Sequence, residues 1–150
     1  MELSRFTDYS LRTLIFAGLH ADRIVTIGEV SATYRISENH LVKIIHKLGK
    51  LGFVDTKRGR SGGFQLSREP SAINLGEVVR ATESLSLVEC LGADVGHCPI
   101  VRVCQLRSVI VEAREAFLEV FDRRTLEDML EPRKALFAVS GGARKGEKSV

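Results

Sequence analysis

The chain has 150 residues, of which 44% are hydrophobic and 27% charged, with no Trp and a formal net charge of +3. This length fits one domain with accessory segments, and the composition favours a small helical protein over a β-sandwich or a disulfide scaffold. No run approaches the ~20 apolar residues of a membrane span. The first residues also lack the basic start and apolar run of a secretory signal, so we expect a cytoplasmic protein.

Three helices are predicted in the first fifty residues. Leu11, Leu14, Ile15 and Leu19 form an apolar stripe over residues 7–20. Thr26, with Glu29 three residues later, predicts a capping box and a second helix through Tyr34. Ser37 can cap a third helix, whose single apolar face carries Leu41, Ile44, Ile45 and Leu48. Two short helices joined by a tight turn outline a helix-turn-helix.

A hairpin is predicted directly after these helices. Residues 53–56 and 64–67 favour short strands on either side of a basic, glycine-rich turn at 57–63. Asn74 then caps a fourth helix over residues 75–82. The predicted fold is therefore mainly α with a small β-hairpin wing, a winged helix-turn-helix.

A long C-terminal helix carries the next pattern. Its apolar residues recur at spacings of three and four, and they are Val103, Leu106, Ile110, Ala113, Phe117 and Val120. Such a heptad seam needs a partner, and symmetric dimers are the commonest assembly. We therefore expect a dimerisation helix and a homodimer, while packing against its own domain is the alternative.

Charge is distributed unevenly along the chain. Residues 35–60 carry seven Lys/Arg against Glu38 and Asp55, a net charge of +5. Residues 71–130 carry six basic and ten acidic residues, a net charge of −4. A basic segment beside an acidic half is typical of a nucleic-acid-binding face, although a solvated helix surface gives the same pattern.

The basic segment coincides with the elements that would touch DNA. The second helix of a helix-turn-helix enters the major groove, which selects Ser37, Asn39, His40, Lys43 and Lys47 as candidates. Asn can read adenine, and Lys can contact guanine or phosphate. The wing adds Arg58, Arg60 and Gly62, because arginines on a narrow turn can reach the minor groove. Gly62 and Gly63 are expected to supply either positive φ or close backbone approach. The expected partner is a double-stranded DNA operator.

Three cysteines within fifteen residues form the sharpest motif, with Cys90, Cys98 and Cys104 spaced Cys-x7-Cys-x5-Cys. Cytosolic thiols stay reduced, and three is an odd number for disulfides. Soft thiolates on an open loop suit zinc or an iron–sulfur cluster. The closely spaced cysteine pairs of zinc sites are absent. Three thiolates with one ligand from elsewhere fit a cluster, whereas free cysteines are the alternative.

Motifs along the chain resemble a known family. They are Phe6-Thr7-Asp8-Tyr9 with Leu11-Arg12, the stretch Asn39 to Ile45, Val54 with Arg58 to Gly63, and Leu85 to Cys90. Across residues 1–130 the chain resembles the iron–sulfur winged-helix repressors of the NsrR/IscR/RirA type. The resemblance is strongest to the nitric-oxide-sensing members, and it implies a repressor that holds a [4Fe-4S] cluster and releases DNA when nitric oxide attacks that cluster.

The resemblance also implies a fourth ligand and exposes departures from the family pattern. Asp8 of one protomer would complete the cluster held by the other, whereas a first-turn carboxylate paired with Arg12 is the alternative. Arg107 stands where members with a [2Fe-2S] cluster carry His, which disfavours that alternative cofactor. The gap between Cys90 and Cys98 looks like that of iron-responsive members, which tend to have Asn in place of Asp8.

The sequence predicts four segments: a DNA-binding domain at 1–82, a cluster-binding loop at 83–104, the dimerisation helix with a short helix at 105–130, and a flexible tail at 131–150. The first rival function is an iron-responsive repressor of the same fold. More remote rivals are a thiol-based redox regulator and a cysteine enzyme. Among the four histidines only His97 lies beside a cysteine, and no Ser/His/Asp or nucleotide-binding motif is visible, so we expect no enzyme.

Overall fold

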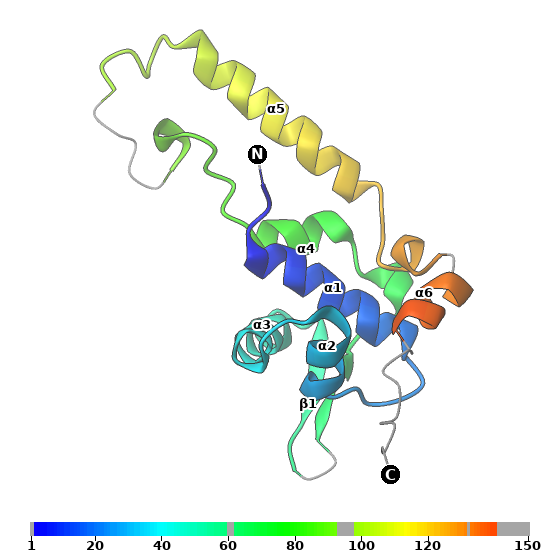
Figure 1. Ribbon diagram of the computed structural model, residues 1–150. Coiled ribbons are helices and arrows are strands. Elements are labelled where there is room, and N and C mark those ends of the chain that lie inside the picture. The colour runs from blue at the N-terminus through cyan, green and yellow to red at the C-terminus, as the bar shows by residue number, and fades with distance from the viewer. Residues whose placement is uncertain (1, 60–61, 93–97, 132, 141–150) are drawn as a thin grey trace, which may run out of the picture.

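The computed structural model describes residues 2–59, 62–92, 98–131 and 133–140. Its elements are α1 (Arg5–Leu19), α2 (Ile27–Tyr34), α3 (Glu38–Lys50), β1 (Val54–Lys57), β2 (Gly63–Leu66), η1 (Pro70–Ala72), α4 (Leu75–Thr82), η2 (Glu89–Leu91), α5 (Gln105–Asp122), η3 (Glu127–Leu130) and α6 (Arg133–Ser140). In Figure 1, α1 and α4 lie between α5 on one side and α3 with the hairpin on the other. The predicted fold class, mainly helical with a two-stranded wing, is confirmed. None of the described helices could span a membrane.

Polar caps start the helices where the sequence predicts them. Thr26 and Glu29 form the capping box of α2, with the Thr26 N–H donating to Glu29 Oε2 at 2.8 Å. The Ser37 side chain caps α3, and Asn74 accepts the Glu77 N–H at 3.2 Å to cap α4. α1 begins earlier than expected because Ser4 caps it. These caps satisfy backbone donors that a helix start leaves unpaired.

The turn between α2 and α3 fixes the helix-turn-helix angle. Arg35 has φ 55° and ψ 40°, the left-handed conformation. This conformation costs a non-glycine residue roughly 1–2 kcal/mol. Ile36, which follows, is 3% exposed and belongs to the core. Burial of Ile36 therefore helps to hold the chain in this reversal.

The hairpin is antiparallel, with Val54 opposite Leu66 and Thr56 opposite Phe64. Both strands lie one residue away from their expected positions. Gly63 must be glycine, since a Cβ there would overlap the backbone oxygen of Val25, which pairs with Phe64 across an isolated bridge. Neither Gly62 nor Gly63 has positive φ, so the close-approach alternative is the correct one.

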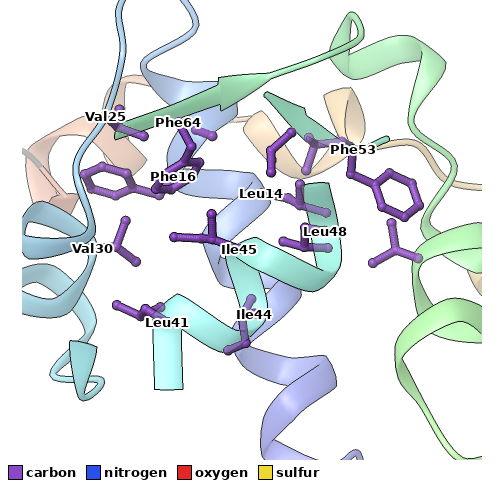
Figure 2. Close-up of a cluster of buried hydrophobic side chains, with 14 of the residues drawn as sticks. Leu14, Phe16, Val25, Val30, Leu41, Ile44, Ile45, Leu48, Phe53 and Phe64 are labelled. Carbon is purple, nitrogen blue, oxygen red and sulfur yellow. The ribbon is translucent and has the colours of Figure 1, made fainter. Parts of the chain in front are cut away.

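The core forms where the apolar faces of α1 and α3 meet the hairpin (Figure 2). Its members are all 5% exposed or less, and they include Leu14, Phe16, Val25, Val30, Leu41, Ile44, Ile45, Leu48, Phe53 and Phe64. The stripe predicted for the third helix is therefore its buried face. Since apolar burial contributes about 25 cal/mol per Å², this face fixes the rotation of α3 about its axis.

α5 contacts its own domain mainly near its C-terminal end. Leu118 is its buried residue, at 2% exposure, whereas Leu106 and Val120 are more than 60% exposed. An Arg80–Asp122 ion pair joins α4 to α5. Val103 lies in a turn before the helix, so the predicted seam is one position too long: the helix starts only after Cys104, its N-cap.

The chain then returns to the core. Leu126 is fully buried, and its N–H donates to the Ile73 carbonyl at 2.8 Å. Within the segment expected to be a flexible tail, residues 133–140 form α6, a helix that was not predicted from the sequence. Phe137 of α6 lies edge-on to His20 with ring centroids 5.3 Å apart, and this contact packs α6 on α1. Residues 141–150 lie outside the described residues.

Two glycine substitutions should shift stability in opposite directions. A Cβ at Gly76 would overlap the Asp122 carboxylate, so Gly76→Ala should lower the free energy of unfolding by about 1–3 kcal/mol. Gly49 lies in α3 with 3.7 Å to its nearest neighbour, so Gly49→Ala should raise stability by up to about 1 kcal/mol. Urea unfolding midpoints measure both. An unchanged midpoint for Gly76→Ala would contradict the packing of α4 on α5, and a loss for Gly49→Ala would contradict the open space beside Gly49.

Candidate DNA interface and cysteine site

The solvent-facing side of α3 carries the predicted DNA contacts. Asn39, His40, Lys43 and Lys47 are exposed, opposite the buried stripe, and Ser37 serves as the N-cap. Sequence reasoning missed three further exposed residues on this helix, Val42, His46 and Lys50. Helical spacing from the apolar stripe could have found them, because every position opposite that stripe must face solvent.

The start of α3 also contacts α1 through ring edges. The His40 ring lies edge-on to Tyr9 with centroids 5.9 Å apart. The Arg12 guanidinium lies over the same Tyr9 ring, 5.9 Å from its centroid. One aromatic side chain of α1 therefore contacts both the recognition end of α3 and an arginine on its own helix.

The wing presents positive charge on a constrained turn. Lys57 and Arg58 are exposed, and Gly59 has φ 109°, which strongly favours glycine. A Cβ at Gly62 would come within 2.5 Å of the Lys57 carbonyl oxygen. Gly62 therefore allows the turn to close, while its contact with DNA stays a prediction. Arg60 lies outside the described residues.

The three cysteines belong to the segment between α4 and α5, which in Figure 1 lies far from the hairpin. Cys90 in η2 and Cys104 at the start of α5 are half-buried, Cys98 is exposed, and none forms a disulfide. The described part of the chain contains no group of three His, Cys, Asp or Glu side chains close enough to hold a metal. His97 falls outside that part. Three free thiols outside the core are a donor set that suits a cluster, and their ligation stays a prediction.

Asp8 lies in the first turn of α1 and forms an ion pair with Arg12. Its Oδ2 is 2.8 Å from an Arg12 terminal nitrogen, and Oδ1 accepts from Arg12 Nε at 2.9 Å. The ion pair with Arg12, the alternative for this carboxylate, is therefore present, while its role as a cluster ligand stays a prediction. The Asp8 side chain remains 39% exposed. A second chain can therefore reach it.

Glu83 connects the cysteine segment to the same turn of α1. It follows α4 directly, and its Oε2 accepts the Ser4 N–H at 2.8 Å. Burial would raise the pKa of Glu83, but hydrogen bonds from Ser4 and Thr7 outweigh burial and hold this pKa below its usual value. A carboxylate at a helix start is also favoured by the helix dipole. The segment that carries the cysteines is thus anchored one turn from Asp8.

Comparison with known proteins gives the family. Residues 3–132 match Rrf2, described as iron-dependent transcriptional regulator. The chain belongs to the Rrf2 family. The HTH-type transcriptional regulator NsrR of Bacillus licheniformis is 46% identical over 132 residues, 87% of this Rrf2 chain and 92% of that protein. NsrR of Geobacillus kaustophilus is 48% identical over 138 residues, 91% and 94% of the two chains.

Solved structures agree with this membership. CymR, the global cysteine regulator of B. subtilis, is 30% identical with a TM-score of 0.66 over 86% of this chain and 95% of that one. IscR of T. potens is 26% identical with a TM-score of 0.70, and the match covers 97% of this chain and 94% of that one. The resemblance noted in the sequence is confirmed. This Rrf2 protein is a transcriptional regulator and not an enzyme.

Removing the wing arginine should weaken DNA binding in a charge-specific way. Arg58→Ala should lower affinity for operator duplex and reduce the slope of log affinity against log salt by about 1, because one cation is removed from the surface that faces DNA. The matched control is Arg124→Ala, which removes an exposed arginine beyond the end of α5. Equal salt slopes in both variants would show that Arg58 of the wing does not contact DNA.

Proposed function

We propose that the chain is a DNA-binding repressor that works as a homodimer, senses nitric oxide through a [4Fe-4S] cluster, and releases its operator when that cluster is attacked. The observation that carries this proposal is the presence, in one Rrf2 chain, of an exposed basic α3 with a wing and three free cysteines on a separate segment. Relatives named NsrR at 41–48% identity support it. The site of action is the cytoplasm.

DNA binding follows from the exposed faces described above. The first turns of α3 present Asn39 and Lys43 to base edges in the major groove, while Arg58 on the wing reaches an adjacent groove. Lys47 lies one turn after Lys43 and contacts phosphate. Two such units in a dimer would read half-sites about 34 Å apart, one turn of DNA.

The apolar surface of α5 supports dimerisation. Leu106, Val109 and Val120 are 63%, 59% and 61% exposed on this 18-residue helix. Exposed apolar residues repeated along one helix mark an interface, because isolated monomers rarely leave such surfaces in water. A second copy of α5 offers the same apolar surface, which suits a symmetric, isologous contact.

Cys90, Cys98 and Cys104 of one protomer would hold the cluster, with Asp8 of the other protomer as the fourth ligand. When bound, the cluster supplies iron that reacts with nitric oxide. A carboxylate is a hard, weak ligand for such iron, so Asp8 would be the ligand held least tightly. In the described chain Asp8 pairs with Arg12 instead, which is the partner it would have without a cluster.

This assignment would connect sensing to DNA binding through α1. Asp8 and Tyr9 are neighbours on that helix, and Tyr9 contacts His40 at the start of α3. A bond between Asp8 and the cluster of the other protomer would therefore constrain α1, the helix against which α3 packs. The two states are a dimer in which Asp8 links the chains and one in which Asp8 returns to Arg12.

An iron-responsive repressor is the second candidate, favoured by the family description, iron-dependent transcriptional regulator. The long interval between Cys90 and Cys98 also favours it. Both candidates use the same thiols and differ in the signal. The deciding experiment is anaerobic operator binding titrated with nitric oxide and, separately, with an iron chelator. Release by nitric oxide at stoichiometric amounts supports the proposal, whereas release only by the chelator supports the iron-responsive alternative.

Each cysteine should be indispensable for the cluster. Replacement of Cys90, Cys98 or Cys104 by Ala should abolish the visible absorbance of anaerobically purified protein and lower specific DNA affinity, since the chain has no further thiol. Iron and sulfide assays check the loss. A full cluster spectrum in two of the three variants would refute the ligand set, and a colourless wild-type protein would favour a thiol-based regulator.

Asp8→Ala should act differently from the cysteine variants. Three thiolates would still hold a cluster, but its spectrum should change and its coupling to DNA binding should weaken. Arg12→Ala is the matched control, because it removes the same ion pair while leaving the carboxylate. Identical spectra of wild-type and Asp8→Ala protein would exclude Asp8 as a ligand and make His97 or a small molecule the candidate.

A further inference from the structure

Val42 is the apolar exception on the solvent-facing side of α3. Its side chain is 52% exposed, while the other large apolar residues of the helix, Leu41, Ile44, Ile45 and Leu48, are 5% exposed or less. A single exposed valine needs no explanation by itself. The residues around Val42, however, suggest a reason for its exposure.

Val42 lines an open groove of about 780 Å³ between α3 and the wing. His46 and Lys50 line the same groove from α3, and Val54 and Thr56 line it from β1. Lys50 and Arg58 bring positive charge to this groove, and Asp55 is the acidic residue among those that line it. Val42 thus lies inside a surface whose cations suit a polyanion.

The position of Val42 along α3 selects base edges over phosphates. It is the fifth residue of the helix, between Asn39 and the later polar residues His46 and Lys50. Early residues of a recognition helix meet base edges, whereas residues further along contact the backbone. Val42 therefore lies in the part of α3 that would face base edges.

We propose that Val42 reads the 5-methyl group of a thymine in each operator half-site. The isopropyl group has neither donor nor acceptor, so the base feature it can recognise in the major groove is the thymine methyl. This inference rests on the proposed function, since it requires α3 to bind in the major groove. It adds a specificity-determining residue that charge and hydrogen bonding do not reveal.

The test uses uracil, which differs from thymine only in lacking the methyl group. An operator is first selected from a randomised duplex pool with the full-length wild-type protein. Each thymine in a half-site is then replaced by uracil. At one thymine position, the replacement by uracil should weaken wild-type binding about fourfold per half-site. This is the change in affinity expected for loss of one buried methyl-sized group. Val42→Ala should bind the parent duplex about as weakly as wild type binds the uracil duplex, and should not respond to that replacement.

Lys43→Ala provides the matched control on the neighbouring position. It should weaken binding but retain the wild-type response to uracil, because the methyl contact remains. Retention of the full uracil response by Val42→Ala overturns the inference, as does a wild-type protein that tolerates every uracil. Either result, with normal operator selection, overturns the role of Val42 and leaves the proposed DNA-binding function intact. If wild type selects no duplex, the proposed function fails together with this inference.

Discussion

Packing of α3 against α1 constrains everything else in this molecule. Leu41, Ile44 and Leu48 are completely buried, and Leu14 of α1 lies among them in the core. Rotating α3 about its axis would expose this apolar face, and each large side chain brought into water would cost about 1.5–3 kcal/mol. The core therefore determines which polar residues face outward. The interface with DNA is a consequence of burial on the opposite side of the same helix.

α1 stands at the centre of the arrangement. Besides α3 it contacts α4, β2, η3 and α6, so its position is fixed from several sides. Its first turn nevertheless remains accessible, because Asp8 and Arg12 keep substantial exposure while paired with each other. Glu83 holds the beginning of the cysteine segment against that turn. A signal that reaches Asp8 would thus reach the helix that supports α3, with no flexible element between them.

Local chemistry made much of this fold predictable from the sequence. Thr26 with Glu29, Ser37 and Asn74 begin helices because their side chains satisfy free backbone donors, which depends on a few neighbouring residues. The winged helix-turn-helix followed from these caps and from a hairpin turn rich in glycine.

Features that depend on distant contacts could not be predicted in this way. The packing of α6 on α1 is one example, because it depends on Phe137 meeting His20, a residue far away in the chain. Gly76 shows its importance only when Asp122 lies against it. The candidate site divides similarly. The thiols and the polar face of α3, including the position of Val42 on it, can be found in the sequence, whereas the groove that Val42 shares with β1 and the wing appears only in the folded chain. A ligand supplied by a second chain is not encoded in the spacing of either one.

The central claim is that Asp8 acts across the dimer, and mixed dimers test it most directly. One protomer carries intact cysteines with Asp8→Ala, and its partner carries Cys90→Ala with Asp8 intact, so only a ligand in trans can complete the single cluster. The account predicts a wild-type spectrum and normal nitric oxide response for this dimer. The reciprocal dimer, with both substitutions in one protomer and none in the other, should show the altered spectrum of Asp8→Ala. Exchange of these two results would place the ligand within the same chain and contradict the account.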